Sequence, residues 1–299
     1  MSAVRASDPQ AHWVVADPEN LAARIRLAAV RMVAPHGLGY LGQALSAAEQ
    51  IAALFAIARP GADRIVCSPG HYVIGVYAAA AELGLIHPEQ LASYGQDGSP
   101  LEAIGTERSP VFDWVGGSLG QGLSVAAGFA LADRLRGTAA RTFVMVSDGE
   151  LEEGQVWEAA MFAAHHGLAS LTVLLDANNS QVDGPVDTVT TIEPIAAKWT
   201  AFGWNAIDVN GHDTGAICDA LRTAAATDDI GGPLLSPGVH QGSIDAPRPT
   251  VLICRTSARH GLDCLPDDAD GHFLKLPAEL AERAVAELSA RLATPSGRP

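Results

Sequence analysis

The segment from Ser147 to Gly184 constrains the fold of this chain more than any other. It reads SDGELEEGQVWEAAMFAAHHGLASLTVLLDANNSQVDG, with an acidic turn after one apolar strand and an Asn-rich turn after the next. Asp148 and Asn178 are separated by about 30 residues, the length of one strand-helix-strand unit. Such a unit brings the ends of two parallel strands to the same edge of a sheet. We therefore expect both side chains at one edge, as half of a metal-diphosphate site.

Strands and helices alternate along the rest of the chain. The predicted strands are 64–68, 142–146, 171–175, 204–209 and 250–254. The predicted helices are 18–32, 46–58, one that begins near residue 72, 123–136, 152–166, 194–202, 214–226 and 277–292. Ser46 followed by Glu49 predicts a capping box for the second helix. This order predicts an α/β fold with a doubly wound, mainly parallel sheet and helices on both faces.

We expect the 299 residues to form a single domain. Residues 1–17 are predicted to be an N-terminal arm, the Gly/Pro/Ser-rich residues 227–249 a surface insert, and residues 294–299 a disordered tail. The stretch 95–115 is irregular and holds Gly, Pro and mixed charges. Long connections of this kind usually cover a ligand rather than fill a core.

The net charge of −15 disfavours nucleic acid and anionic membrane surfaces as partners. A phosphorylated cofactor would need a metal ion and backbone amides to supply positive potential. The four cysteines are too scattered for a disulfide framework or a zinc site, which suits a reducing cytoplasm. No apolar run approaches the ~20 residues that span a bilayer, and the N-terminus has no apolar signal region. We expect a cytoplasmic protein.

Asp148 and Asn178 offer the oxygen ligands that a hard cation takes. Mg²⁺ and Ca²⁺ bind carboxylate, amide and main-chain carbonyl oxygens together with the phosphates of a bound ligand. Each residue also has an ordinary structural explanation, because Asp caps helices and Asn pairs are common in turns. It is their joint position that favours a metal site.

A glycine-rich segment, residues 116–122, precedes a helix of small residues. The free amides and the dipole at a helix N-terminus suit a phosphate group. Glycines before a helix also serve close packing or a turn, and both interpretations stay open.

His36 and His71 each lie beside a glycine at the end of a predicted element, where a side chain can point into a crevice at the sheet edge. A histidine in such a place is often a hydrogen-bonded structural residue, so the pattern alone leaves its role open. The carboxylates of Glu150, Glu152 and Glu153 open a helix, and favourable interaction with the helix dipole explains them without a function.

Taken together, these motifs resemble the diphosphate-binding domain of the transketolase family. The matching stretches are APHGLG, SPGH, GGSLGQGLSVAAGFALA, SDGELEEGQVWEAA and DANNSQVDGPVD, in order from about residue 20 to 215. The resemblance returns from Arg255 to Leu276. The Asp148 and Asn178 pair is similar to the thiamin diphosphate motif that begins with Gly-Asp-Gly and ends with Asn. The resemblance implies the thiamin diphosphate-binding fold and transfer of a two-carbon unit from a ketose or related donor to an acceptor.

The resemblance also implies roles for individual residues. The implied metal ligands for Mg²⁺ or Ca²⁺ are Asp148, Asn178 and the main-chain carbonyl of Ser180. The implied contacts with thiamin diphosphate are His71, Gly117, Leu119, Gly149, Glu150, Asn178, Ser180 and His272. Catalytic roles are implied for His36, His71 and His272, and coupling of paired sites across a subunit interface for Glu153 and Glu158.

The sequence departs from the family pattern in three places. Ser147 replaces the first glycine of Gly-Asp-Gly, which keeps the metal ligand itself. Ile104 stands where the family has a histidine that contacts the hydroxyl of a ketose donor, so a polar partner of the donor is lost. The chain also ends where full-length transketolases continue into a pyrimidine-binding domain. We therefore expect a second subunit that carries this domain and its catalytic glutamate, in a heterotetramer with two copies of each subunit.

Two other functions are compatible with the residues. A 2-oxo acid decarboxylating component that acts on a pyruvate-like donor would fit the loss of the donor-contacting histidine at Ile104. A non-catalytic subunit of the same fold is the second alternative, and the retention of Asp148, Asn178, His36 and His71 argues against it.

Overall fold

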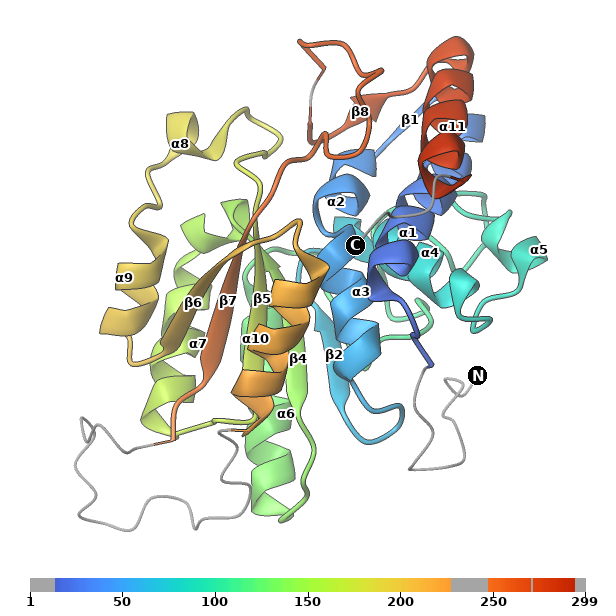
Figure 1. Cartoon of the computed structure of the whole chain (residues 1–299). Helices are drawn as coiled ribbons and strands as arrows, with labels where there is room; N and C mark the ends of the chain where they lie inside the picture. Colours follow the sequence, from blue (N-terminus) through green and yellow to red (C-terminus); the bar gives the residue numbers. More distant parts are fainter. Residues whose placement is uncertain (1–13, 227–246, 270, 294–299) are drawn as a thin grey trace, which may run out of the picture.

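Six parallel strands form the central sheet in the computed structural model, which describes residues 14–226, 247–269 and 271–293 (Figure 1). Across the sheet they are β3 (Trp114–Val115), β2 (Arg64–Cys67), β4 (Thr142–Ser147), β5 (Leu171–Ala177), β7 (Thr250–Arg255) and β6 (Asn205–Asn210). Outside this sheet, β1 (Leu38–Gly39) pairs antiparallel with β8 (Leu274–Lys275). The predicted fold class is confirmed.

Helices cover both faces of the sheet (Figure 1). The first face carries α1 (Pro18–Val33), α3 (Ala48–Ile57), α4 (Val73–Glu82) and α10 (Thr214–Ala226). The second face carries α6 (Gln121–Leu135), α7 (Gly154–His165) and α9 (Ile195–Ala201). The remaining α-helices among the described residues are α2 (Leu41–Ser46), α5 (Pro88–Leu91), α8 (Val186–Val189) and α11 (Ala278–Ala293). Single 3₁₀ turns are formed by Ala34–His36, Gly70–Tyr72 and Gly149–Glu152.

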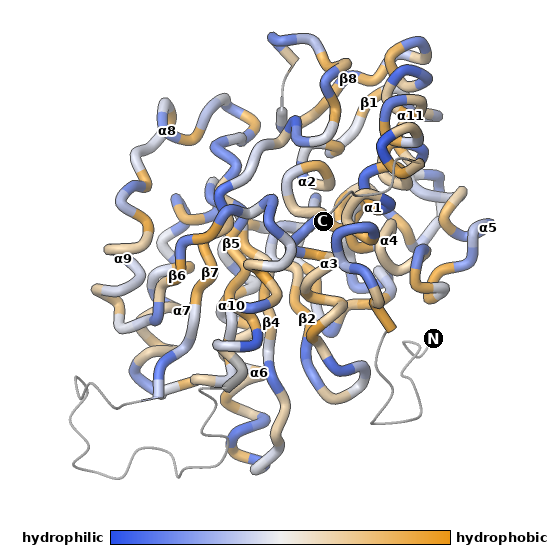
Figure 2. Tube along the Cα trace, in the orientation of Figure 1, coloured by the Kyte–Doolittle hydropathy of each residue, from blue (hydrophilic) through white to orange (hydrophobic). Residues whose placement is uncertain are grey.

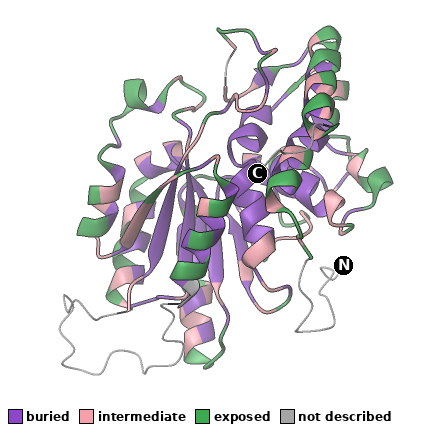
Figure 3. Cartoon of the chain, viewed as in Figure 1, coloured by how far each residue is buried: buried purple, intermediate pink, exposed green. Residues whose placement is uncertain are grey.

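The strands are apolar on both sides because each side meets a layer of helices. In β4, Phe143 and Met145 belong to the core under the first face, whereas Val144 and Val146 belong to the core under the second. The strands therefore read as continuous apolar runs, as expected for a buried parallel sheet. Figure 2 shows the central strands as largely hydrophobic, and Figure 3 shows them as buried between helices whose outer sides are exposed.

The predicted helix 46–58 is present as α3 (Ala48–Ile57), but its predicted start at Ser46 and its capping box are wrong. Two helices occupy this region: α2 ends at Ser46, and α3 begins two residues later. The Ser46 hydroxyl donates to the Asp176 carboxylate instead of capping α3. Glu49 is buried and forms an ion pair with Arg26 of α1. The directions of both side chains are thus determined by buried charged partners from distant segments, which the local sequence does not reveal.

The Glu49 carboxylate makes the stability of the fold depend on acid pH. Burial alone would raise its pKa, but the hydrogen bond with His212 and the charge of Arg26 lower it from 4.5 to about 2. His260 is the other ionisable side chain that faces this carboxylate. Because the folded-state pKa is depressed, Glu49 contributes stability that is present above pH 4.5 and is lost as the pH falls toward 2.

We therefore expect Glu49→Gln to lower the free energy of unfolding near neutral pH by about 3 kcal/mol, because Arg26 is left buried without its charged partner. The difference from the unchanged chain should shrink as the pH falls from 4.5 toward 2, where Glu49 itself becomes protonated. Urea unfolding across this range measures both quantities. If the difference in unfolding free energy between the two chains stayed constant with pH, the lowered pKa of Glu49 would be contradicted.

Three predictions about the chain fall wholly or mostly outside the described residues. They are the N-terminal arm, of which residues 14–17 are described, the surface insert, of which residues 247–249 are described, and the tail 294–299. A separate finding concerns membranes: within the described ranges, every helix is too short or too polar to cross one.

Candidate functional site

The predicted metal ligands follow neighbouring parallel strands. Ser147, the last residue of β4, lies opposite Asp176 of β5 in the register of the two strands. Asp148 and Asn178 come directly after this point, and the backbone N–H of Asn179 donates to Asp148 Oδ2 at 2.6 Å. The structure therefore brings Asp148 and the Asn178 turn together at the carboxyl edge of the sheet, as the spacing predicts.

Asp176 organises this edge, and sequence reasoning missed it. Its carboxylate is 1% exposed and accepts hydrogen bonds from several elements at once. Among the described residues, the side-chain donors are Ser46, Gln50, Tyr72, Asn178 and Thr256. They come from α2, α3, the turn before α4, and the segments after β5 and β7. A carboxylate inside an otherwise apolar strand, two residues before Asn178, was the available signal.

The site carries buried negative charge. Burial raises the pKa of Asp148 to about 7, and the neighbouring Asp176 charge adds to the effect. Burial also raises the pKa of Asp176, although its hydrogen bonds favour the charged form. No lysine or arginine in the described ranges forms an ion pair with either carboxylate. A bound cation would offset this charge.

The donor atoms fit Mg²⁺ or Ca²⁺. Each Asp148 oxygen accepts one main-chain N–H, and Asn178 Oδ1 accepts the N–H of Ser180 at 2.9 Å. These bonds fix the direction of the oxygens and leave further lone pairs for a metal ion, because carboxylate and amide oxygens accept more than one partner. Hard cations take ligands of this kind.

Two of the three predicted histidines form one aromatic cluster. The rings of His71 and His272 have centroids 5.0 Å apart. Burial lowers the pKa of His71 to about 3, and the neighbouring His272 adds to the effect, so His71 is neutral at physiological pH. His272 Nδ1 lies 3.0 Å from Gln43 Nε2 of α2. Tyr40 joins the cluster, with its ring centroid 5.2 Å from His71 and 5.7 Å from His272. Sequence reasoning missed both Gln43 and Tyr40.

His36 makes its contacts elsewhere. Its Nε2 lies 2.8 Å from the carbonyl oxygen of Tyr94, and the two rings pack edge to face. The side chain is exposed and lines a cavity of about 400 Å³ with Arg31, Met32 and Gln96 among its other residues. Among the described residues, the ring contacts of His36 do not include the cluster that contains His71, and a catalytic role for His36 stays a prediction.

The amides of the glycine segment are engaged within the protein. Gly120 N donates to Glu150 Oε1 at 2.6 Å, and Gly122 N donates to Ser68 Oγ at 3.0 Å. The Ser68 hydroxyl in turn donates to Glu150. The expectation that free amides at the start of α6 suit a phosphate is therefore wrong for these two amides, because a buried carboxylate and a hydroxyl already occupy them.

Glu150 is completely buried, and burial raises its pKa to about 7 against the hydrogen bonds from Ser68 and Gly120. Its predicted contact with the cofactor stays a prediction, and its carboxylate supports the glycine segment. Within that segment Gly117 is exposed, as is Leu119 at 37%.

The remaining predicted residues lie around the same edge or on α7. Gly149 N donates to Asp148, and Ser180 is half-buried in the turn after β5. Glu153 and Glu158 are exposed, at the start of α7 and on its outer side. A residue at a subunit interface must be exposed in the single chain, and both glutamates meet this requirement. Their role in coupling paired sites stays a prediction.

The fold and the carboxyl-edge site are those of an α/β domain that binds a diphosphate cofactor. Residues 18–279 match the family model of the transketolase thiamine diphosphate binding domain. The chain belongs to the transketolase family. Thiamin diphosphate as cofactor and a thiamin diphosphate-dependent transferase subunit of transketolase type are thereby confirmed predictions.

Relatives of two lengths are similar to the chain. A transketolase family protein of Sinorhizobium fredii is 37% identical over 272 residues, which are 87% of this chain and 91% of the relative. A 6-deoxy-6-sulfo-D-fructose transketolase subunit of a Clostridium species is 33% identical over 91% of this chain and 96% of the relative. The structure of transketolase from Leishmania mexicana aligns with a TM-score of 0.75 and 25% identity, over 94% of this chain but 42% of that protein.

Proposed function

We propose that this chain is the diphosphate-binding subunit of a two-chain transketolase-like enzyme that moves a two-carbon unit from a ketose or related donor to an acceptor. The observation that carries the proposal is the buried edge where Asp148 and the Asn178 turn meet beside Asp176, within a transketolase family domain. When bound, thiamin diphosphate supplies a thiazolium carbon that adds to the donor carbonyl and stores the resulting negative charge.

The residues of this chain would bind and orient that cofactor. Asp148, Asn178 and the Ser180 carbonyl would hold Mg²⁺ or Ca²⁺ against its diphosphate, and the metal would balance the two buried carboxylates. His71, kept unprotonated by burial, and His272 would stand beside the diphosphate, since their rings lie together. Neutral imidazoles can donate one hydrogen bond each without adding a fixed charge.

We further propose a heterotetramer with two copies of this chain and two copies of a subunit that carries the pyrimidine domain and its glutamate. The chain spans 42% of the Leishmania transketolase but 96% of the Clostridium subunit. Exposed apolar side chains are available for interfaces: Met161 and Phe162 on α7 are 53% and 41% exposed, and Val182, beside the metal turn, is 74% exposed. Glu153 and Glu158 would lie at the α7 interface.

The preference for a donor is inferred from Ile104 and from the name of one relative. Ile104 is 42% exposed at a place where the family has a histidine that contacts the donor, so this side chain offers no hydrogen bond to a donor hydroxyl. One relative, of which the chain spans 96%, is named a 6-deoxy-6-sulfo-D-fructose transketolase subunit, which supports a modified ketose as the donor. We therefore favour a modified ketose as the donor, rather than an ordinary ketose phosphate or a pyruvate-like compound.

The experiment is co-expression of this chain with the product of a neighbouring reading frame that encodes a pyrimidine domain. The purified complex is supplied with thiamin diphosphate and Mg²⁺, and then with xylulose 5-phosphate, 6-deoxy-6-sulfofructose or pyruvate. We expect transfer to an aldose acceptor from one of the sugars. Release of CO₂ from pyruvate would establish the 2-oxo acid alternative instead, and full turnover by this chain alone would refute the two-chain proposal.

We also propose that the chain is one diphosphate-binding domain that works in the cytoplasm. All four cysteines are free thiols, and three of them are buried in the core, which suits a reducing compartment.

A further inference from the structure

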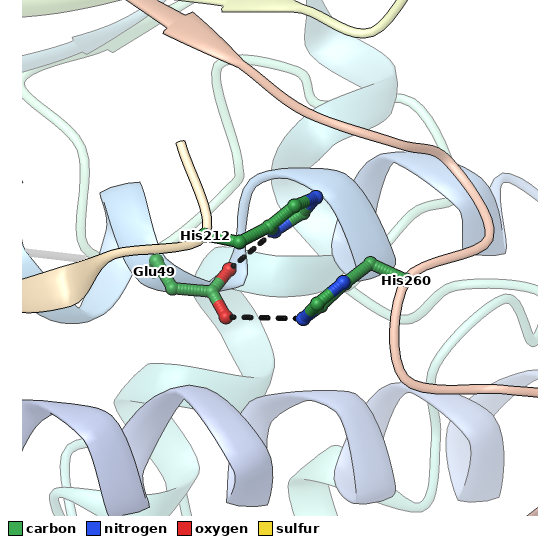
Figure 4. Close-up of side chains that lie close together, drawn as sticks. All are labelled: Glu49, His212 and His260. Atoms are coloured by element: carbon green, nitrogen blue, oxygen red, sulfur yellow. Dashed lines mark hydrogen bonds and ion pairs between the residues drawn. The ribbon is translucent and has the colours of Figure 1, made fainter. Parts of the chain in front are cut away.

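A second cluster of polar side chains lies beside the candidate cofactor site. Glu49 comes from α3, His212 from the turn after β6, and His260 from the segment after β7, and their ligand atoms lie within 4.8 Å of one another (Figure 4). The cluster lines a cavity of about 420 Å³ that also touches Arg26 and Arg291. The three residues belong to segments that are far apart in the sequence, so the cluster joins three parts of the fold.

A carboxylate with two imidazoles is a ligand set that suits Zn²⁺, but the geometry opposes a metal here. The rings of His212 and His260 are stacked with centroids 3.6 Å apart and planes 10° apart. Lone pairs lie in the ring planes, so two parallel stacked rings cannot both aim at one ion. The Arg26 guanidinium already binds Glu49 at 2.5 Å, with both side chains 6% exposed.

The hydrogen bonds of His212 instead connect Glu49 to the backbone at Ser257. The backbone N–H of Ser257 donates to His212 Nε2 at 2.9 Å. Nε2 is therefore the unprotonated nitrogen, and Nδ1 carries the proton that faces Glu49 Oε2 at 3.3 Å. Glu49 is fixed from the other side by Arg26, which also donates to the carbonyl of Leu45. His212 thus connects a rigid ion pair between helices to the backbone of the segment after β7.

That segment continues directly into the cofactor site. Thr256, next to Ser257, donates its hydroxyl to Asp176 and its N–H to the carbonyl of Ala177. Further along, the segment brings His272 beside His71. Its first residues are therefore held at Ser257 by His212 and at Thr256 by the carboxyl edge of the sheet.

We propose that His212, whose Nδ1 faces Glu49, is a positioning residue of the cofactor site: through its bond to Ser257 it holds the backbone of the segment 256–269, and thereby Thr256 and the approach to His272. The proposal rests on the proposed function for its consequence, because thiamin diphosphate is the ligand whose binding would change. Neither residue contacts Asp148, Asp176 or the ring cluster through any bond among the described residues.

Two conservative variants separate the two bonds of His212. In His212→Gln the amide oxygen can take the place of Nε2 and accept the Ser257 N–H, whereas the bond to Glu49 is lost. In His212→Asn the amide nitrogen can replace Nδ1 and donate to Glu49, but the side chain is too short to reach Ser257. If His212 acts by holding the segment through Ser257, the His212→Gln variant should keep its affinity for the cofactor. If His212 only provides a hydrogen-bond partner for Glu49, the His212→Asn variant should keep that affinity instead.

We expect His212→Ala and His212→Asn to raise the Kd of the assembled complex for thiamin diphosphate with Mg²⁺ by about tenfold, and His212→Gln to raise it by less than about threefold. Fluorescence titration measures this, and Arg222→Ala, an exposed change on α10, is the matched control. The reverse order, with Asn retaining affinity and Gln losing it, would overturn the proposal.

Hydrogen–deuterium exchange of the full chain without cofactor gives a second readout that does not depend on the proposed function. Amides in 256–269 should exchange faster in His212→Ala and His212→Asn than in His212→Gln. Faster exchange without any thiamin diphosphate binding by the unchanged complex would refute the proposed function and leave the positioning role intact. Equal exchange in all variants, or Zn²⁺ binding that is lost in both His212→Ala and His260→Ala, would overturn the positioning role.

Discussion

Asp148→Asn should abolish metal-dependent cofactor binding and at the same time stabilise the metal-free chain. The substitution removes the charge of a proposed metal ligand, so we expect the Kd for thiamin diphosphate with Mg²⁺ to rise at least about 100-fold and activity of the assembled complex to be lost. The same carboxylate costs stability without a cation, because burial and Asp176 raise its pKa from 3.8 to about 7. A raised folded-state pKa means that stability is lost as the pH rises through this range.

At pH 8 the carboxylate is charged in both folded and unfolded chains, and the folded chain bears the full cost. We therefore expect Asp148→Asn to raise the free energy of unfolding without metal by on the order of 2 kcal/mol, and by much less at pH 4. Thermal unfolding with and without Mg²⁺ tests both parts, since Mg²⁺ with the cofactor should stabilise only the unchanged chain. Unaltered activity of the Asp148→Asn complex would instead favour a non-catalytic subunit.

Gly122→Ala should strongly destabilise the fold. A Cβ at this position would lie 2.4 Å from both Cβ and Oγ of Ser68, at the point where α6 meets the end of β2. Relief of this clash requires α6 to shift, which would break the Gly122 to Ser68 bond and the link from Ser68 to Glu150. We expect a loss of about 3 kcal/mol of unfolding free energy, at the upper end for overpacking of a core.

Gly128→Ala is the matched control, because Gly128 lies in the same helix and a Cβ there meets nothing within 4 Å. This variant should gain about 0.5–1 kcal/mol from the higher helix propensity of alanine. Urea unfolding gives the free energy of unfolding of both variants. Comparing the two values separates the cost of crowding against Ser68 from the general effect of an alanine in α6. A similar stabilisation in both would show that α6 can move away from Ser68 at little cost.

The parts of the fold that could be predicted from sequence are those with a strong local pattern. Apolar runs separated by helical periodicity gave the main strands of the sheet within two residues of their observed bounds, and the turn residues Asp148 and Asn178 followed from the strand ends. Parallel strands must place their carboxyl ends at one edge, so no long-range information was needed for that step. Two-residue strands such as β1 and β8 carry no such pattern, and they were missed.

Directions of side chains could not be predicted, because distant partners determine them. Glu49 has the local signature of a helix cap, but a buried arginine from α1 binds it. His36 follows a proline and ends a 3₁₀ turn before Gly37, whose φ is 71°, and the turn leaves its ring against Tyr94. Asp176 was overlooked since a lone carboxylate in an apolar strand has meaning only once its donors from other elements are known.

The parallel sheet also places the candidate cofactor site and an exposed turn suitable for chemical attachment at opposite ends of its strands. The predicted ligands lie at the carboxyl ends of β4 and β5, whereas the turn between α6 and β4, residues 136–139, is exposed at the opposite end of β4. A six-residue strand is about 20 Å long. A fluorophore or surface tether attached to this turn would therefore stay clear of the cofactor, and single complexes could be immobilised there.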